Sequence, residues 1–242
     1  MKAVQVDDWV TTRAMRLVRA VVQTGLIFPA LSCFCRVTAV GRESLQALNG
    51  PAVFVANHVS ELDAVVMAAA LPPRLRRQSV VVAARDSVFK HKAKARLAQV
   101  VVCAVPISRT GGARPYLDNL KQLIERGWSV IMFPEGRVTV TGAMATFRKG
   151  AAMIAMDSRV PVVPTYVDGM YGVMRTFRRA PRPGRVTVTF GPQMLAGEGE
   201  NYARFTARIE STVRELAGPK GVAVDPPTSG SRALDLSYWP SR

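Results

Sequence analysis

The stretch FVANHVSELDAVVMAAAL, residues 54–71, predicts a strand, a polar loop and a helix in succession. The apolar run AVFVA, residues 52–56, is continuous, as expected of a strand that is covered on both faces of a sheet. The segment 61–71 has the length and composition of a helix and stops at Pro72, because proline breaks helices. A polar loop separates the two, so the stretch predicts one strand–loop–helix unit.

The same alternation continues through most of the chain. Apolar, β-branched runs predict further strands at 79–83, 100–105, 129–133, 160–167 and 185–190. Helical patterns lie between and after them, at 87–99, 113–126, 149–158 and 201–217. We therefore predict an α/β fold with a mixed, largely parallel sheet flanked by helices.

Length and composition favour one folded domain with two appendages. A chain of 242 residues with 48% hydrophobic residues can bury a single core. We expect an N-terminal helical segment at 1–39, a domain at 40–217 and a flexible tail at 218–242, which lacks hydrophobic periodicity. The net charge of +16 favours an anionic partner, which could be nucleic acid, a phospholipid surface or a phosphorylated substrate.

The N-terminal segment has the character of a membrane-associated helix. Residues 20–35, AVVQTGLIFPALSCFC, carry no charge, and arginines precede and follow them. A spanning helix needs about 20 apolar residues, so this run is short for a span. We predict a helix that lies in one leaflet with its arginines at the headgroups. A helix packed on the core and a true span remain the alternatives.

The three cysteines, Cys33, Cys35 and Cys103, lie in apolar surroundings and have no partner residues at zinc-ligand spacing. We expect them to be buried thiols in a reducing cytosol, and we expect no metal.

Two interpretations compete for His58 and Asp63. Ser60 followed by Asp63 fits a capping box at the start of a helix. Alternatively, the first turn of that helix brings Asp63 back to one imidazole nitrogen of His58, and the other nitrogen acts as a general base. The loop after a strand is a common place for ligands in α/β folds, which supports the second interpretation.

Two more polar loops follow predicted strands. Arg109 lies beside Gly111 and Gly112, which leave main-chain N–H groups open to an anion. Glu135 and Arg137 flank Gly136, where a sharp turn would present a carboxylate and a guanidinium to a common cleft. Convergence of three such loops at one sheet edge predicts a functional site.

Four blocks in this order resemble the glycerolipid acyltransferase family typified by 1-acylglycerol-3-phosphate acyltransferase. His58 to Asp63 fits the HxxxxD pattern, and residues 107–109, Ile-Ser-Arg, fit the second block. Residues 133–136, FPEG, and 160–164, VPVVP, fit the third and fourth. The resemblance covers about residues 40–195.

The resemblance implies transfer of a fatty acyl group from acyl-CoA or acyl carrier protein to a hydroxyl of a lysophospholipid. It implies that His58 deprotonates this hydroxyl, that Asp63 orients His58, and that no covalent acyl-enzyme forms. No cofactor besides the acyl donor is implied.

The same resemblance assigns the binding residues. Arg109 and the turn of Glu135, Gly136 and Arg137 would bind the glycerol phosphate of the acceptor. Pro164 of the fourth block would shape the acyl-donor site.

One departure concerns the third block, which reads FPEGR here where many members read FPEGTR. The arginine is one position nearer the glutamate, and the threonine function would have moved to Thr139 or Thr141. This detail is most similar to the acyltransferase domain of 2-acylglycerophosphoethanolamine acyltransferase. The acceptor could therefore be of the lysophosphatidate or the lysophosphatidylethanolamine type.

Basic residues gather at Lys90, Lys92, Lys94 and Arg96, and again at 175–185, which suits a membrane surface or an acidic carrier protein. We expect the protein at the cytoplasmic face of the inner membrane, peripheral or monotopic. Two alternatives are an acyl-thioester hydrolase with the same pair and a non-catalytic basic protein that binds membranes or nucleic acid. Aromatic residues are only 7%, so no nucleic-acid partner is expected.

Overall fold

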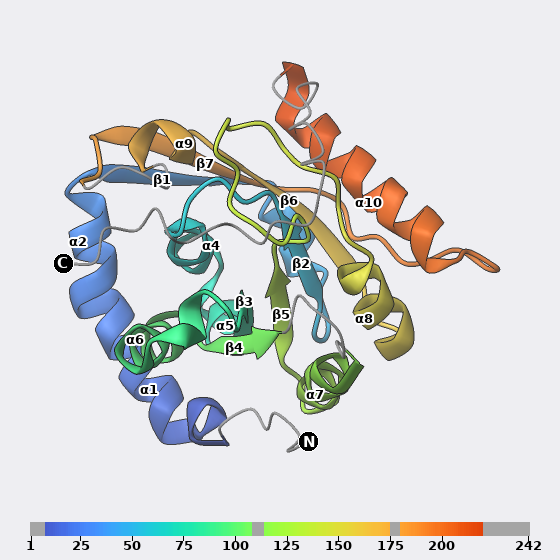
Figure 1. Ribbon diagram of the computed structural model, residues 1–242, viewed down its shortest axis with the longest axis horizontal. Helices are drawn as coiled ribbons and strands as arrows, with labels where there is room; N and C mark the ends of the chain where they lie inside the picture. Colours follow the sequence, from blue (N-terminus) through green and yellow to red (C-terminus); the bar gives the residue numbers. More distant parts are fainter. Residues whose placement is uncertain (1–7, 108–113, 175–179, 220–242) are drawn as a thin grey trace.

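The computed structural model describes residues 8–107, 114–174 and 180–219. Within these ranges, seven strands form one sheet in the order β1-β7-β6-β2-β5-β3-β4 (Figure 1). The strands are β1 (Cys35–Val40), β2 (Val53–Ala56), β3 (Ser79–Ala84), β4 (Ala104–Ile107), β5 (Ser129–Met132), β6 (Val162–Asp168) and β7 (Gly184–Phe190). All neighbours are parallel except β6 and β7. The predicted α/β fold with a mixed, largely parallel sheet is confirmed.

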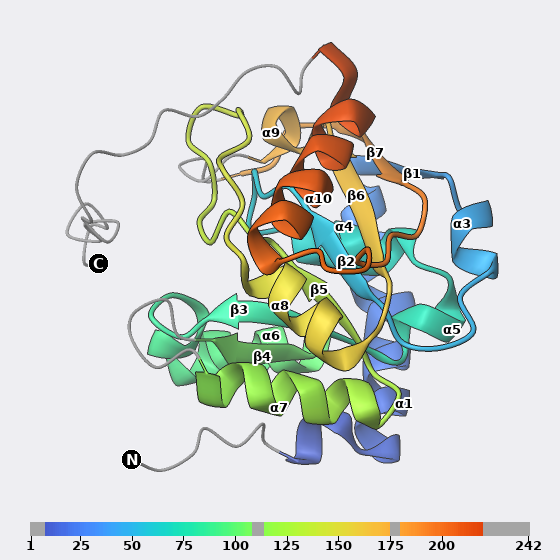
Figure 2. The ribbon, with the colours of Figure 1, turned by 90° about the vertical axis from the view of Figure 1, so that its right-hand side faces the viewer.

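Helices cover both faces of the sheet (Figures 1 and 2). One face carries α4 (Asp63–Ala70) and α6 (Lys92–Val102), and the other carries α7 (Arg114–Glu125), α8 (Gly150–Ser158) and α10 (Tyr202–Ala217). Strand β2 divides its side chains between two cores, with Phe54 and Ala56 in one and Val53 and Val55 in the other. This alternation explains why the strand is apolar at every position.

The short elements lie in the connections. They are the 3₁₀ turns η1 (Asp8–Thr11) and η3 (Val88–Lys90) and the single-turn helices α3 (Glu43–Gln46), α5 (Pro73–Arg76) and α9 (Met170–Val173).

The N-terminal helix is continuous from Arg13 to Ser32, and it is long and apolar enough to cross a membrane. It consists of α1 (Arg13–Val22), the π-helical turn η2 (Gln23–Ile27) and α2 (Phe28–Ser32). The buried Arg19 donates to the carbonyls of Gln99 and Val100, and Gln23 donates to that of Val101. The carbonyls of Val100 and Val101 lie in the last turn of α6, where the helix itself provides no donor, whereas that of Gln99 also accepts the N–H of Cys103. The outer face exposes apolar side chains, namely Leu17, Val18, Val21 and Leu26.

Three expectations need correction. Residues 100–102 are the end of α6 and not a strand, because the left-handed Cys103 (φ 55°) ends the helix and β4 starts only at Ala104. The helix expected from residue 87 begins at Lys92, after the separate turn η3. Cys33 is exposed, because it follows the last turn of α2, whereas Cys35 and Cys103 are buried.

Strand β1 has no counterpart among the predicted strands. It pairs with β7 in parallel along its whole length, from Cys35 opposite Gly184 to Val40 opposite Thr189. The sheet therefore begins at Cys35, ahead of the residue 40 at which the sequence placed the start of the domain.

Candidate active site

The carboxyl ends of five adjacent strands, β6, β2, β5, β3 and β4, meet at one edge of the sheet, because these strands are mutually parallel. His58 follows β2 at this edge, and Glu135 follows β5. Strand β4 also ends here, at Ile107, but Arg109 in the next loop lies outside the described residues. The topology thus brings together the first and third of the predicted polar loops.

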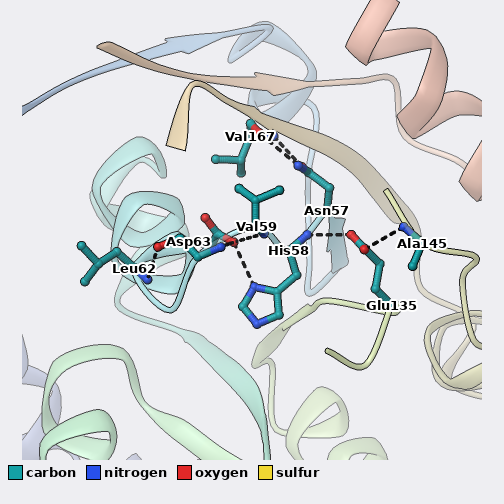
Figure 3. Close-up of polar contacts among 9 residues, drawn as sticks. Asn57, His58, Val59, Leu62, Asp63, Glu135, Ala145 and Val167 are labelled. Carbon is teal, nitrogen blue, oxygen red and sulfur yellow. Dashed lines mark hydrogen bonds and ion pairs between the residues drawn. The ribbon is translucent and has the colours of Figure 1, made fainter. Parts of the chain in front are cut away.

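His58 and Asp63 are in direct contact (Figure 3). The distance from Nδ1 of His58 to Oδ2 of Asp63 is 2.9 Å. The Asp63 side chain is fully buried, whereas that of His58 is 20% exposed. A buried carboxylate that accepts from Nδ1 fixes the imidazole tautomer in which Nε2 carries the lone pair.

The same carboxylate oxygen organises the loop between the two residues. Oδ2 of Asp63 also accepts the main-chain N–H groups of Val59 at 2.7 Å and Ser60 at 2.9 Å. Ser60 Oγ accepts from the N–H of Leu62 at 3.2 Å. Helix α4 begins at Asp63, two residues later than expected from residue 61, because these contacts keep the intervening residues in a turn. The contact that the dyad interpretation requires is therefore present, whereas the N-cap position of α4 is Leu62 and not Ser60, and the Leu62 side chain makes no capping bond.

The imidazole of His58 also packs against an aromatic ring. Its ring stacks on that of Phe133, with centroids 4.4 Å apart and an angle of 19° between the planes. In the portions of the chain that the structure describes, Nε2 has no hydrogen-bond partner. The ring is thus fixed in orientation while one nitrogen stays available to a substrate.

Glu135, which follows the neighbouring strand β5, binds the loop that carries His58 (Figure 3). Its Oε1 accepts the N–H of His58 at 2.7 Å, and its Oε2 accepts the N–H of Ala145 at 2.9 Å. Burial raises the pKa of Glu135 to about 8, although the two N–H bonds and the charge of Arg137 oppose this shift. The expectation that its carboxylate faces a cleft is wrong, because the residue is 3% exposed and both oxygens bind main-chain N–H groups.

Gly136 forms the turn that the sequence predicts. Its φ of 72° lies in the left-handed region, where side chains are strained. Arg137 follows it and is partly exposed. The turn therefore leaves Arg137 at the sheet edge next to Glu135.

Pro164 is not brought to these loops. It is a buried residue within β6, paired with Val55 of β2, and its carbonyl accepts the N–H of Gly191 at 2.8 Å. Its assignment to the acyl-donor site remains a prediction.

Two residues hold the main chain or the loop of His58, of which Asn57 was not singled out from the sequence and Thr139 was named only for a displaced threonine function. Asn57 is buried, donates to the carbonyl of Val167 at 3.1 Å and accepts the N–H of Val167 at 2.7 Å, so it ties the loop to β6. The main chain of the buried Thr139 donates to the carbonyl of His58 at 2.9 Å. A polar residue directly after an apolar strand was the available signal for Asn57, whereas a main-chain contact leaves no signal in the sequence.

The long connection between β5 and α8 is fastened to the rest of the domain. The N–H of Phe147 donates to Glu210 of α10 at 2.8 Å, and the hydroxyl of Tyr171 donates to the carbonyl of Val140 at 2.9 Å. These contacts hold the segment that carries Glu135 and Thr139 beside His58. Within residues 8–107, 114–174 and 180–219, no cluster of histidine, cysteine and acidic side chains could hold a metal ion.

The fold and the site define an α/β protein with a histidine at the carboxyl edge of its sheet, paired with a buried aspartate. The family model described as Acyltransferase matches residues 36–168, which is more than half of the chain, and the chain belongs to this family.

Individual relatives agree with this membership. A 1-acyl-sn-glycerol-3-phosphate acyltransferase of Chlamydomonas reinhardtii is 31% identical over 64% of this chain and 46% of its own length. The 1-acyl-sn-glycerol-3-phosphate acyltransferase alpha of Mus musculus is 30% identical over 59% of this chain and 49% of its own length. The chain thus spans about half the length of the curated relatives that it matches.

A solved structure shares the fold. The crystal structure of the 1-acyl-sn-glycerophosphate acyltransferase PlsC from Thermotoga maritima superposes with a TM-score of 0.61. The alignment has 20% sequence identity and covers 84% of this chain and 77% of that one.

Proposed function

We propose that the protein transfers a fatty acyl group from a thioester, acyl-CoA or acyl carrier protein, to the free hydroxyl of a lysophospholipid. The observation that carries the proposal is the contact between Nδ1 of His58 and the buried Asp63, which leaves Nε2 open at the sheet edge. Membership in the acyltransferase family supports it.

In this reaction Nε2 of His58 accepts the proton of the acceptor hydroxyl as its oxygen attacks the thioester carbonyl carbon. The carbon–oxygen bond forms, the carbon–sulfur bond breaks, and the departing thiolate takes the proton from His58. Asp63 stabilises the imidazolium that exists between the two proton transfers. General-base assistance of this kind contributes roughly 10²- to 10⁴-fold to the rate.

The acceptor is proposed by analogy with the relatives named for 1-acyl-sn-glycerol-3-phosphate. A lysophosphatidylethanolamine-type diester is the alternative acceptor, because of the FPEGR spacing. Arg109 and Arg137 are proposed to bind the phosphate, and Glu135 and Gly136 are proposed to shape the turn that presents Arg137.

The N-terminal helix supports a membrane-bound substrate. Its exposed apolar side chains and its docking through Arg19 suit a helix that lies in one leaflet while the domain stays at the surface. We propose peripheral or monotopic binding at the cytoplasmic face of the inner membrane.

The decisive experiment is mass spectrometry of the lipids formed from a panel of lysophospholipids with acyl-CoA and acyl carrier protein donors. Wild type should form a diacyl lipid, and His58→Ala should lose most of this product. Equal product from both proteins would contradict the role of His58. Release of free fatty acid without diacyl lipid would indicate a thioester hydrolase instead.

A further inference from the structure

Arg148 lies on the FPEG turn although it is outside the blocks that the sequence pattern identifies. Its main-chain N–H donates to the carbonyl of Pro134 at 2.9 Å. Its side chain covers Gly136, where a Cβ would lie 2.9 Å from Nε and 3.3 Å from Cζ of Arg148. The side chain therefore rests on the turn that follows β5, twelve residues after Gly136 in the sequence.

The guanidinium of Arg148 is available to a ligand. The residue is exposed, and among the described residues no hydrogen bond or ion pair to its side chain is present. The same turn carries Glu135, which binds the N–H of His58. An arginine with free N–H donors thus lies on the loop that positions the histidine.

We propose that Arg148, together with Arg137, binds the phosphate of the acceptor and favours a phosphate monoester over a diester. Arg137 follows Gly136 in the sequence, and the side chain of Arg148 lies against Gly136 in the structure. A monoester offers three terminal oxygens and up to two negative charges, whereas a diester offers two such oxygens and one charge. Paired guanidinium groups bind several phosphate oxygens at once, so they discriminate by the number of oxygens and the charge.

Gly136 contributes to this arrangement because it has no side chain. Any side chain there would displace the Arg148 guanidinium, since its Nε is too close to the position of a Cβ. The glycine therefore allows both the left-handed turn and the seating of Arg148 on it.

This inference rests on the proposed acyl transfer, and its test compares two acceptors. The KM and kcat for lysophosphatidate and for lysophosphatidylethanolamine are measured for wild type, Arg148→Met, Arg148→Lys and Lys149→Met. Lys149 is the matched control, because it is the neighbouring exposed basic residue and its replacement changes the net charge equally.

Arg148→Met should raise the KM for lysophosphatidate on the order of tenfold. Its kcat and its KM for the diester should change less than twofold. Arg148→Lys should recover part of the loss, and Lys149→Met should match wild type. An unchanged KM for lysophosphatidate in Arg148→Met, or equal losses for both acceptors, would overturn the inference.

Binding separates this inference from the proposed reaction. The affinity for lysophosphatidate in detergent micelles is compared between His58→Ala and the double variant His58→Ala/Arg148→Met. This binding measurement does not require either variant to catalyse the reaction. Weaker binding by the double variant supports the role of Arg148 even if wild type forms no diacyl lipid. Equal binding by both contradicts it, and thermal unfolding of both proteins checks that the fold is intact.

Discussion

Replacing Glu135 by glutamine should change how the stability of the protein depends on pH. In the folded state burial raises the pKa of Glu135 to about 8, from an ordinary value of 4.5. Between these two values the folded state retains a proton on this carboxyl that the unfolded state has lost. The group therefore stabilises the fold fully below pH 4.5, and this contribution is lost as the pH rises through 8.

The magnitude follows from the shift. Each pH unit in this window lowers the free energy of unfolding by about 1.4 kcal/mol through this one group. Over the whole window the loss approaches about 5 kcal/mol. A glutamine at 135 does not titrate, but its NH₂ group faces one of the two N–H donors, from His58 or Ala145, at a cost of about 1–3 kcal/mol at every pH.

The assay is urea unfolding at pH 5.5, 6.5, 7.5 and 8.5 in constant detergent, followed by the fluorescence of the buried Trp128. The stability advantage of wild type over Glu135→Gln should shrink by about 1.4 kcal/mol per pH unit up to pH 8. The same change at the exposed Glu198 is the matched control. Parallel pH profiles of wild type and Glu135→Gln would refute the reasoning.

Three further changes test other parts of the structure. Asp63→Asn should lower kcat about 10²- to 10⁴-fold with little change in KM, since the carboxylate that orients the imidazole is lost. Steady-state kinetics measure both constants, and an unchanged kcat would contradict the role of the His58–Asp63 pair. Gly136→Ala should destabilise the fold by about 1–2 kcal/mol, because φ is 72° and Arg148 lies against the Cβ position. Thermal unfolding measures the loss, and an unaltered Tm would count against strain at the turn. Arg19→Met should lower the free energy of unfolding by about 3 kcal/mol, since three main-chain carbonyls lose a charged donor. Limited proteolysis should then cleave the N-terminal helix faster in this variant than in a variant with the same change at the exposed Arg13. Equal cleavage rates would show that Arg19 does not dock the helix.

The central strands could be predicted because their signal is local. The residues of β2 are all apolar, and those of β5 are apolar after the buried Ser129. A polar loop follows each strand, so composition alone located them. The end of α6 could not be predicted in this way. Val100 to Val102 have strong β propensity, but their environment places them in a helix that stops only at the left-handed Cys103.

Strand β1 illustrates a second limit. Its partner β7 lies about 150 residues later in the chain, and no local pattern reports such a pairing. The residues before it are apolar and helical, so the start of the strand was assigned to the N-terminal helix.

The site was predictable to the extent that it depends on spacing. The contact of His58 with Asp63 follows from a loop that enters a helix, and the sequence contains both elements. The direction in which Glu135 points does not follow from the sequence, because its two donors belong to residues 77 and 10 positions away. Burial of that carboxylate is a property of the assembled sheet edge.

The way in which Asp63 holds its loop determines which substitutions the motif tolerates. The partners of Oδ2 between the two ends of the motif are main-chain N–H groups of residues 59 and 60, and every amino acid except proline supplies such a group. Side chains at these positions are therefore free to vary as far as packing permits, whereas the histidine and the aspartate are not. A proline at either position would remove a donor and disturb the orientation of the imidazole without touching the pair itself. Within the four variable positions of HxxxxD, the contacts with Oδ2 of Asp63 are thus made by the main chain and not by side chains.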